Sequence, residues 1–357
     1  GVIPQTSFVL PIGISFFTLS AIGTLIDVYN GKQKAEINIV RFSLYIMFFP
    51  RIIMGPLLRY STFCKIMDKQ NSGLSSIGKG IGTFVKGLAK KVIVADTLYM
   101  LYSAANRVDA EKVTALTAFL GVLAYLLCLY FNMSGFADMG CGIAECFGIH
   151  FPKSFNYPLF SKKICYFRGR WLTQLNFWFR RYAEKPITFI CRKKWLKMTV
   201  FAFVSGMVGF WYTFSFNGFT AGFFIGTAML IESRFANRTT LNFTGIAYTA
   251  AASLIWVVFL STSGLKDAFG CFSELFGRYG LADSLSIYLL RKYIPIIILS
   301  LFASTDLFGK IMKKAGKNKH TGKAVLIFTP AVILGLLAVC TVLISADGYS
   351  EMIQFRF

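Results

Sequence analysis

Long uncharged apolar runs constrain this chain more than any other feature of its sequence. A helix of about 20 residues crosses the hydrocarbon core of a bilayer, and several runs have that length. One over residues 199–231 predicts two spans, because Asn217-Gly218 favours a turn in its middle. With 55% hydrophobic residues, we predict an all-α polytopic membrane protein with a single domain over residues 1–357. The other candidate spans cover residues 113–131, 245–263, 285–303 and 324–346.

The net charge of +22 reflects membrane topology rather than nucleic-acid binding. Lys and Arg collect in loops that stay on the cytoplasmic side of a membrane. The two richest basic stretches, residues 153–197 and 310–323, are separated by four predicted spans, so they lie on the same side. We therefore expect the lipid bilayer as the main partner and no nucleic acid.

Two further segments have helical character without being simple spans. Residues 42–58 are apolar but contain Pro50, Arg51 and Gly55 near their centre. Helix breakers and a charge at membrane depth are tolerated where the backbone is buried in protein or lines a wet cavity, which predicts a broken or re-entrant helix. Residues 80–102 begin with several lysines and predict an interfacial amphipathic helix.

Charged residues among small or aromatic ones give the first candidate sites. Asp138 lies in the small-residue segment 132–148, where it is either partnered by an arginine or functional, and we favour the pairing. Residues 160–195 mix arginines, including Arg168 and Arg170, with aromatic side chains. Such a mixture is typical of the membrane interface, and a phosphate or pyrophosphate site is the alternative.

Several collinear segments resemble the membrane-bound O-acyltransferase family, especially its branch of alginate O-acetylation proteins. The resemblance implies a helical bundle around a central tunnel in a bacterial cytoplasmic membrane. It also implies acyl transfer from a cytoplasmic thioester donor to a hydroxyl of a cell-envelope polysaccharide or related polymer, with extracellular partner proteins and without a bound cofactor or metal. The family has further amino-terminal helices, so we expect this chain to be truncated there. The matching segments are LPIGISFFTLSAIGTLIDVY (10–29), LYIMFFPRIIMGPLLRY (44–60), GLAKKVIVAD (87–96), YFNMSGFADMGCGIAECFGIHFPKSFNY (130–157), residues 167–186, GFWYT (209–213) and IQFRF (353–357).

The family carries two histidines, one after Arg-Trp and one after Gly-Leu-Trp, and both are replaced here. Leu172 occupies the first position and Tyr212 the second. An acceptor hydroxyl must lose its proton as it attacks the thioester, and a base with a pKa near the working pH removes it best. A phenol, with an ordinary pKa near 10, is a hydrogen-bond donor before it is a base. Asn176, one helical turn after Leu172, is a candidate for a neutral polar group in the tunnel.

Two hypotheses follow from these replacements. In the first, the chain is a working O-acyltransferase whose catalytic site is rebuilt around Tyr212. In the second, it is a catalytically inactive scaffold that binds an acyl donor or a partner protein. A transporter is a weaker third alternative, which the collinear family match opposes. In the first two cases, the resemblance places further residues along the tunnel or donor site, namely Trp171, Trp211, Arg168, Arg170 and Asp138.

Overall fold

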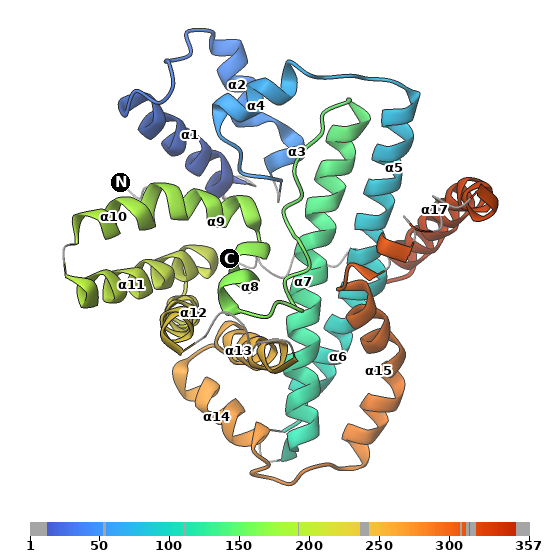
Figure 1. The fold of residues 1–357 in the computed structure, drawn as a ribbon. Coiled ribbons are helices and arrows are strands. Elements are labelled where there is room, and N and C mark those ends of the chain that lie inside the picture. The colour runs from blue at the N-terminus through green and yellow to red at the C-terminus, as the bar shows by residue number, and fades with distance from the viewer. Residues whose placement is uncertain are drawn as a thin grey trace, which may run out of the picture.

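The computed structural model is built from helices packed around one long central helix (Figure 1). Every regular element in the described part of the chain is helical, which confirms the predicted all-α class. The structure describes residues 13–52, 55–109, 112–191, 193–235, 243–307, 309–311, 314 and 319–347.

The central helix is α7 (Ala115–Cys146), with α5 (Leu74–Ala89) and α6 (Asp96–Asn106) along one side (Figure 1). It extends well beyond the predicted span, because the small-residue segment continues the helix. At 1.5 Å per residue, its 32 residues reach about 48 Å, which exceeds the thickness of a hydrocarbon core. Glycines bring α5 and α7 together: a Cβ on Gly87 would lie only 2.6 Å from the carbonyl oxygen of Gly135.

A π-helical segment, Lys90–Ala95, joins α5 to α6 without a break. The predicted interfacial helix is therefore part of one helical run that packs along α7 and buries Leu98 and Leu101. The π-helical segment also carries the partner of Asp138. Lys90 Nζ lies 2.5 Å from Asp138 Oδ2, so the expected arginine partner was wrong and a lysine takes that role.

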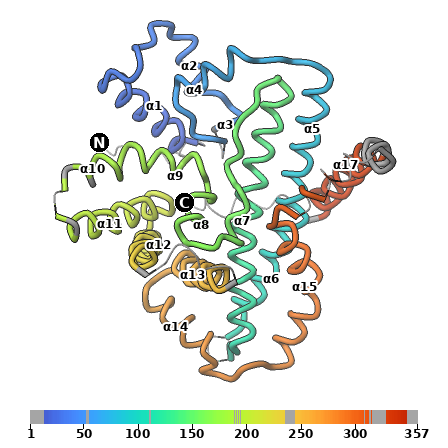
Figure 2. The backbone as a smooth tube through the Cα atoms, in the orientation of Figure 1, coloured from blue at the N-terminus to red at the C-terminus, as the bar shows by residue number. Residues whose placement is uncertain are grey.

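Four helices of the described part are long and apolar enough to cross a membrane, which confirms the polytopic class. They are α7 together with α13 (Phe243–Ser261), α15 (Ser284–Ala303) and α17 (Lys319–Asp347), and they match the predicted spans. α17 meets α5 and then runs away from the rest of the molecule (Figure 2).

The predicted pair of spans over residues 199–231 appears as α11 (Lys194–Thr213) and α12 (Phe216–Phe235), packed side by side (Figure 1). Neither is among the four span candidates. The turn does not fall at Asn217-Gly218 as expected. Ser215 caps the start of α12 instead, since its Oγ accepts a hydrogen bond from the Gly218 N–H at 3.1 Å.

The predicted broken helix is confirmed in α2 (Ile39–Met47) and the short α3 (Phe49–Ile52). Residues 55–59 have no regular structure, and α4 (Tyr60–Met67) follows them. These elements lie together with α1 (Ile14–Tyr29) at one end of the molecule (Figure 1). Residues 10–12 of the matching segment 10–29, and the whole matching segment 353–357, lie outside the described residues.

The start of α15 provides a direct test of local stability. Asp283 Oδ1 accepts a hydrogen bond from the Ser286 N–H at 2.9 Å, and Ser286 Oγ accepts one from the Asp283 N–H at 2.9 Å. We expect Asp283→Ala to lower the free energy of unfolding by about 1 kcal/mol, because α15 loses this capping box. Denaturant unfolding of the detergent-solubilised protein measures the loss.

The same cap has a defined pH dependence. Hydrogen bonds from Ser286 hold the pKa of Asp283 below its usual range. A lowered pKa in the folded state means that this carboxylate stabilises the protein above the ordinary value of about 3.9, and that the contribution disappears as the pH falls through the folded-state pKa. Asp283→Asn is the control, since Asn also caps helices but does not titrate there. An Asn variant with the wild-type acid dependence would contradict this assignment.

Candidate functional site

A cavity of about 100 Å³ lies where α8 (Ile164–Arg170) and α9 (Thr173–Phe179) meet α11, α12 and α13. Both replaced histidine positions, Leu172 and Tyr212, line it. The structure therefore brings into one site two residues that the sequence separates widely. The polar groups of its wall belong to Arg168, Asn176, Ser205 and Tyr212, and most of the other lining residues are apolar or glycine.

Aromatic rings form a rigid wall on one side of this cavity. Trp171 and Trp256 meet edge to face, with ring centroids 5.2 Å apart and an interplanar angle of 82°. Phe167 packs edge-on against Trp256 at 5.7 Å. Interlocked rings of this kind gain stability beyond simple burial, so they hold the shape of the cavity.

Leu172 sits in a strained turn between α8 and α9. Its φ of 45° and ψ of 57° are left-handed, a conformation that costs an ordinary L-residue about 1–2 kcal/mol. Asn176 supports this turn, since its Nδ2 donates to the Arg168 carbonyl at 2.9 Å and also to the Trp171 carbonyl. The Asn176 amide nitrogen thus has a clear structural task, and a catalytic role for Asn176 stays a prediction.

Tyr212 lines the cavity, but its hydroxyl is directed at Met133 of α7. The Oη donates to Met133 Sδ at 2.7 Å. A thioether accepts a hydrogen bond but takes up no proton at ordinary pH. Among the described residues that line the cavity, none is His, Asp or Glu. The structure therefore offers the phenol as a hydrogen-bond donor, without a neighbouring base to activate it.

Within the part of the cavity lining that the structure describes, Arg168 is the one cationic side chain. Its guanidinium forms an ion pair with Glu184, which lies in the π-helical segment Arg180–Glu184 that follows α9. The same guanidinium lies over the Phe201 ring, 5.5 Å from its centroid. Two contacts thus restrain Arg168 at the edge of the cavity, where it is placed to attract an anionic or carbonyl group.

The other predicted site residues lie elsewhere. Trp211 packs between the rings of Phe16 and Phe179, and Arg170 is exposed. Asp138 is held by Lys90 outside the cavity lining. These three were predicted to line the tunnel or the donor site, and the cavity does not include them.

Trp256 and Ser205 line the cavity although the sequence did not single them out. Both lie inside apolar helices, where the sequence does not distinguish a functional aromatic or small residue from one that only packs. A hydroxyl inside a predicted span is the one weak sequence signal that could have indicated Ser205. In the structure its Oγ is buried without a hydrogen-bond partner. A ligand that accepts a hydrogen bond would satisfy it.

Close packing of α11 on α12 shapes one side of the cavity and gives a further prediction. A Cβ on Gly209 would collide with the Gly218 carbonyl oxygen. We expect Gly209→Ala to cost about 1–3 kcal/mol of unfolding free energy, because the two helices must separate. Gly335→Ala in α17 is the control, since nothing lies within 4 Å of a Cβ there. Thermal unfolding of both variants tests this, and equal stability would contradict it.

The fold defines a multi-pass integral membrane protein, and its cavity is small and mostly apolar. The chain is 37% identical to a probable alginate O-acetylase of Pseudomonas aeruginosa, over 50% of this chain and 34% of that relative. It is 28% identical to a probable alginate O-acetylase of Azotobacter vinelandii, over 99% of this chain and 77% of the relative. A peptidoglycan O-acetyltransferase of Helicobacter pylori is 28% identical over 70% of this chain and 52% of its own length.

No protein-family model matches the chain. The relatives nevertheless confirm the resemblance predicted from the sequence: the chain is a homologue of acyltransferases of the membrane-bound O-acyltransferase kind. The matched region spans only about a third of the Pseudomonas aeruginosa relative. The names of the relatives refer to acylation of cell-envelope polymers, and the predicted multi-pass membrane location is confirmed.

Proposed function

We propose that this protein is a membrane O-acyltransferase of a bacterial cytoplasmic membrane. It transfers a short acyl group from a thioester donor on the cytoplasmic side to a hydroxyl of a cell-envelope polysaccharide or related polymer. The acceptor class comes from the relatives, whose names refer to alginate and peptidoglycan. Extracellular partner proteins that present the polymer belong to the same proposal.

One observation carries the proposal: the residues at both family histidine positions, Leu172 and Tyr212, line one cavity. Its size supports a short acyl group, because about 100 Å³ is less than the roughly 150 Å³ of a cavity that holds benzene. An acetyl group fits such a space, whereas a long fatty chain does not. The aromatic wall keeps the reacting carbonyl away from water.

The cavity suits electrophilic catalysis better than proton removal. During attack on a thioester, negative charge develops on the carbonyl oxygen, and a fixed donor in a dry site stabilises it. Ser205 Oγ is a neutral donor on the cavity wall without a partner, and Tyr212 Oη becomes a second donor when its proton turns from Met133 Sδ toward the substrate. Arg168, which is paired with Glu184, adds a cationic group to the wall. As the C–S bond breaks, the acceptor proton passes to the departing thiolate of the donor, so the products are the O-acyl ester and a free thiol.

The absence of a base on the described cavity wall favours a second candidate function. Ionising a phenol at pH 7 costs about 4 kcal/mol, which slows any path that uses Tyr212 as a base. The same cavity also suits a protein that only binds the acyl donor and presents it to a partner protein, without catalysing acyl transfer itself. Binding and transfer must therefore be measured separately.

An assay with radiolabelled acetyl thioester and a polymer acceptor tests the proposed function. We expect slow, protein-dependent O-acetylation, and a decrease of about 10²- to 10³-fold in Tyr212→Phe, which lacks the donor hydroxyl. Tyr248→Phe removes an exposed hydroxyl from α13 and is the matched control. Thioester binding without any transfer by the wild-type protein would establish the scaffold function instead.

A further inference from the structure

A short helix, α14 (Leu265–Leu275), lies between two helices that are long and apolar enough to cross a membrane. α13 ends at Ser261, and α15 begins at Ser284. A segment that joins two consecutive spans lies at one surface of the bilayer. α14 also packs against α7, near the end of the molecule at which α7 begins (Figure 1). The chain thus places α14 at a membrane surface.

The loop after α14 is fixed to the first turn of α7. The carbonyl oxygens of Gly280 and Leu281 accept hydrogen bonds from the N–H groups of Ala115 and Leu116, each at 3.0 Å. These N–H groups have no acceptor within α7, because they lie in its first turn. The start of α7 is therefore held at the same surface as α14.

The side chains of α14 divide into three faces. One face packs on the protein: Ala268 is buried, and the Phe272 ring meets Phe259 of α13 edge to face, with centroids 5.7 Å apart. A second face is charged and exposed, and it includes Lys266 and Asp267. The third face is apolar, yet it is exposed as well.

This third face is a stripe formed by Leu265, Phe269 and Phe276, which directly follows the last residue of α14. Their exposed fractions are 37%, 66% and 90%. Spacings of four and seven residues place the three side chains on one side of a helix. A helix with an apolar stripe beside a charged face suits the plane of a membrane surface, where apolar side chains reach about 5–10 Å into the boundary between headgroups and acyl chains.

The charges of two loops indicate which membrane surface this is. Residues 264–283 contain two basic and three acidic side chains. Residues 310–323, which follow α15, contain six lysines and no acidic side chain. Loops rich in Lys and Arg stay in the cytoplasm, and α15 separates the two loops. α14 is therefore assigned to the extracytoplasmic side.

We propose that α14 is an interfacial helix of the extracytoplasmic membrane surface, which inserts Phe269 and Phe276 among the lipids. The partner is the apolar boundary of the phospholipid bilayer rather than an anionic headgroup, because the exposed charges Lys266 and Asp267 have opposite signs. The spans on both sides of α14 keep its stripe at the bilayer, which favours lipid over a docked protein. Through the loop that follows it, the inserted helix anchors the start of α7.

Fluorescence quenching by brominated lipid tests this insertion. Phe269→Trp adds an indole on the stripe, and Asp267→Trp adds one on the charged face as the matched control. Both variants are reconstituted into phosphatidylcholine vesicles without any other protein, and the wild-type fluorescence is subtracted. Bromine near the headgroups should quench the tryptophan added at position 269 more strongly than bromine near the chain ends. Dissolved acrylamide should quench mainly the tryptophan added at position 267.

A second position keeps the test decisive. Phe276→Trp repeats the measurement on the same stripe if Phe269→Trp does not fold. If acrylamide quenches the tryptophans on both faces equally and brominated lipid quenches neither, the stripe lies in water, where a protein can dock on it, and the proposal is overturned.

Chemical labelling tests the side of the membrane. Spheroplasts that express Asp267→Cys are treated with a membrane-impermeant maleimide, and spheroplasts with the wild-type protein give the background from the native cysteines. We expect labelling above this background before lysis. Labelling that requires lysis would overturn the extracytoplasmic assignment. No acyl transfer is measured in either experiment, so the outcome is independent of the proposed function.

Discussion

Replacing Leu172 and Tyr212 together by histidine is expected to raise the acyl-transfer rate by about 10²- to 10⁴-fold, the usual contribution of a positioned general base. Both side chains line the same cavity, so both imidazoles would face the space proposed for the acyl group. The transfer of labelled acetyl from thioester to polymer, measured at saturating donor, checks the increase. The rate should also acquire a pH dependence near the ordinary imidazole pKa of about 6.5.

The backbone at position 172 favours this replacement. Leu172 has a φ of 45°, and histidine occurs in left-handed conformations several times more often than most other residues. The double variant Leu172→Gln/Tyr212→Gln is the matched control, since it adds polar groups without a base. If the glutamine and histidine variants have equal rates, general-base catalysis at these positions is excluded.

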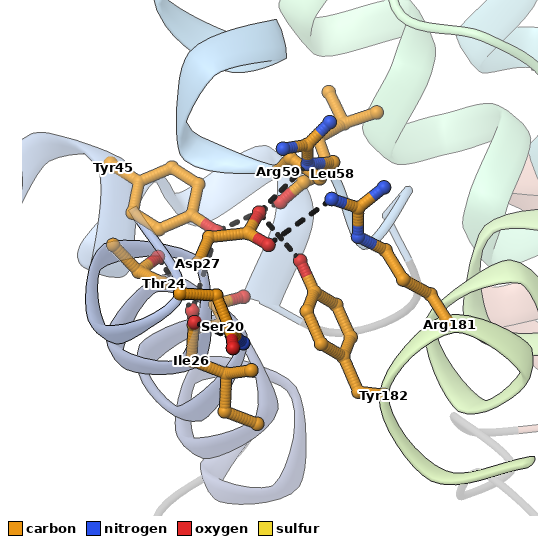
Figure 3. Close-up of polar contacts among 10 residues, drawn as sticks. Ser20, Thr24, Ile26, Asp27, Tyr45, Leu58, Arg59, Arg181 and Tyr182 are labelled. Atoms are coloured by element: carbon orange, nitrogen blue, oxygen red, sulfur yellow. Dashed lines mark hydrogen bonds and ion pairs between the residues drawn. The ribbon is translucent and has the colours of Figure 1, made fainter. Parts of the chain in front are cut away.

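Removing the carboxylate of Asp27 is expected to cost about 3–5 kcal/mol of unfolding free energy. Asp27→Ala leaves Arg59 and Arg181 without their shared counter-charge (Figure 3), and their side chains are only 29% and 25% exposed. Loss of one partner from a largely buried ion pair has this magnitude because the remaining charge is uncompensated. Denaturant unfolding followed by tryptophan fluorescence measures it. Trp178 packs against Tyr182, with ring centroids 5.1 Å apart and an interplanar angle of 48°, and reports on this region.

An exposed pair provides the comparison. Arg41 and Asp68 are 3.0 Å apart, with side chains 45% and 66% exposed. Asp68→Ala should cost less than about 1 kcal/mol, because solvent screens such pairs. Asp27→Asn should lie between the two, since the amide keeps an acceptor but loses the charge. If the alanine variants at positions 27 and 68 are equally stable, the cluster around Asp27 adds little to the fold.

Much of the architecture could be predicted from hydropathy alone. The spans in α7, α13, α15 and α17 correspond to uninterrupted apolar runs of the sequence. The length of such a run is enough to predict a membrane span. The turn between α11 and α12 was misplaced, because Asn-Gly is a strong local turn signal. In the folded chain, capping by Ser215 and a hydrogen bond from Asn217 to the Thr262 carbonyl outweigh that preference.

The candidate site was predictable only in part. Leu172 and Tyr212 were found because their neighbours match a motif, and the cavity brings both together. Trp256 comes from a distant helix and reaches the cavity through helix packing, which no local pattern encodes. Asp138 appeared suitable for an arginine partner, but the π-helical segment presents Lys90 to it instead. Which charged side chains meet depends on how two helices are aligned along each other, and the sequence does not show this alignment.

The contact between Asp27 and Arg181 also has a consequence for biosynthesis. It joins residues 154 positions apart in the chain. At about 5–20 residues per second, a ribosome needs roughly 8–30 s to make the intervening segment. Arg59 follows Asp27 by only 32 residues, so for most of that interval it is the one of these two arginines that α1 can pair with. An insertase or membrane chaperone that shelters α1 would protect the unfinished protein from quality-control proteases.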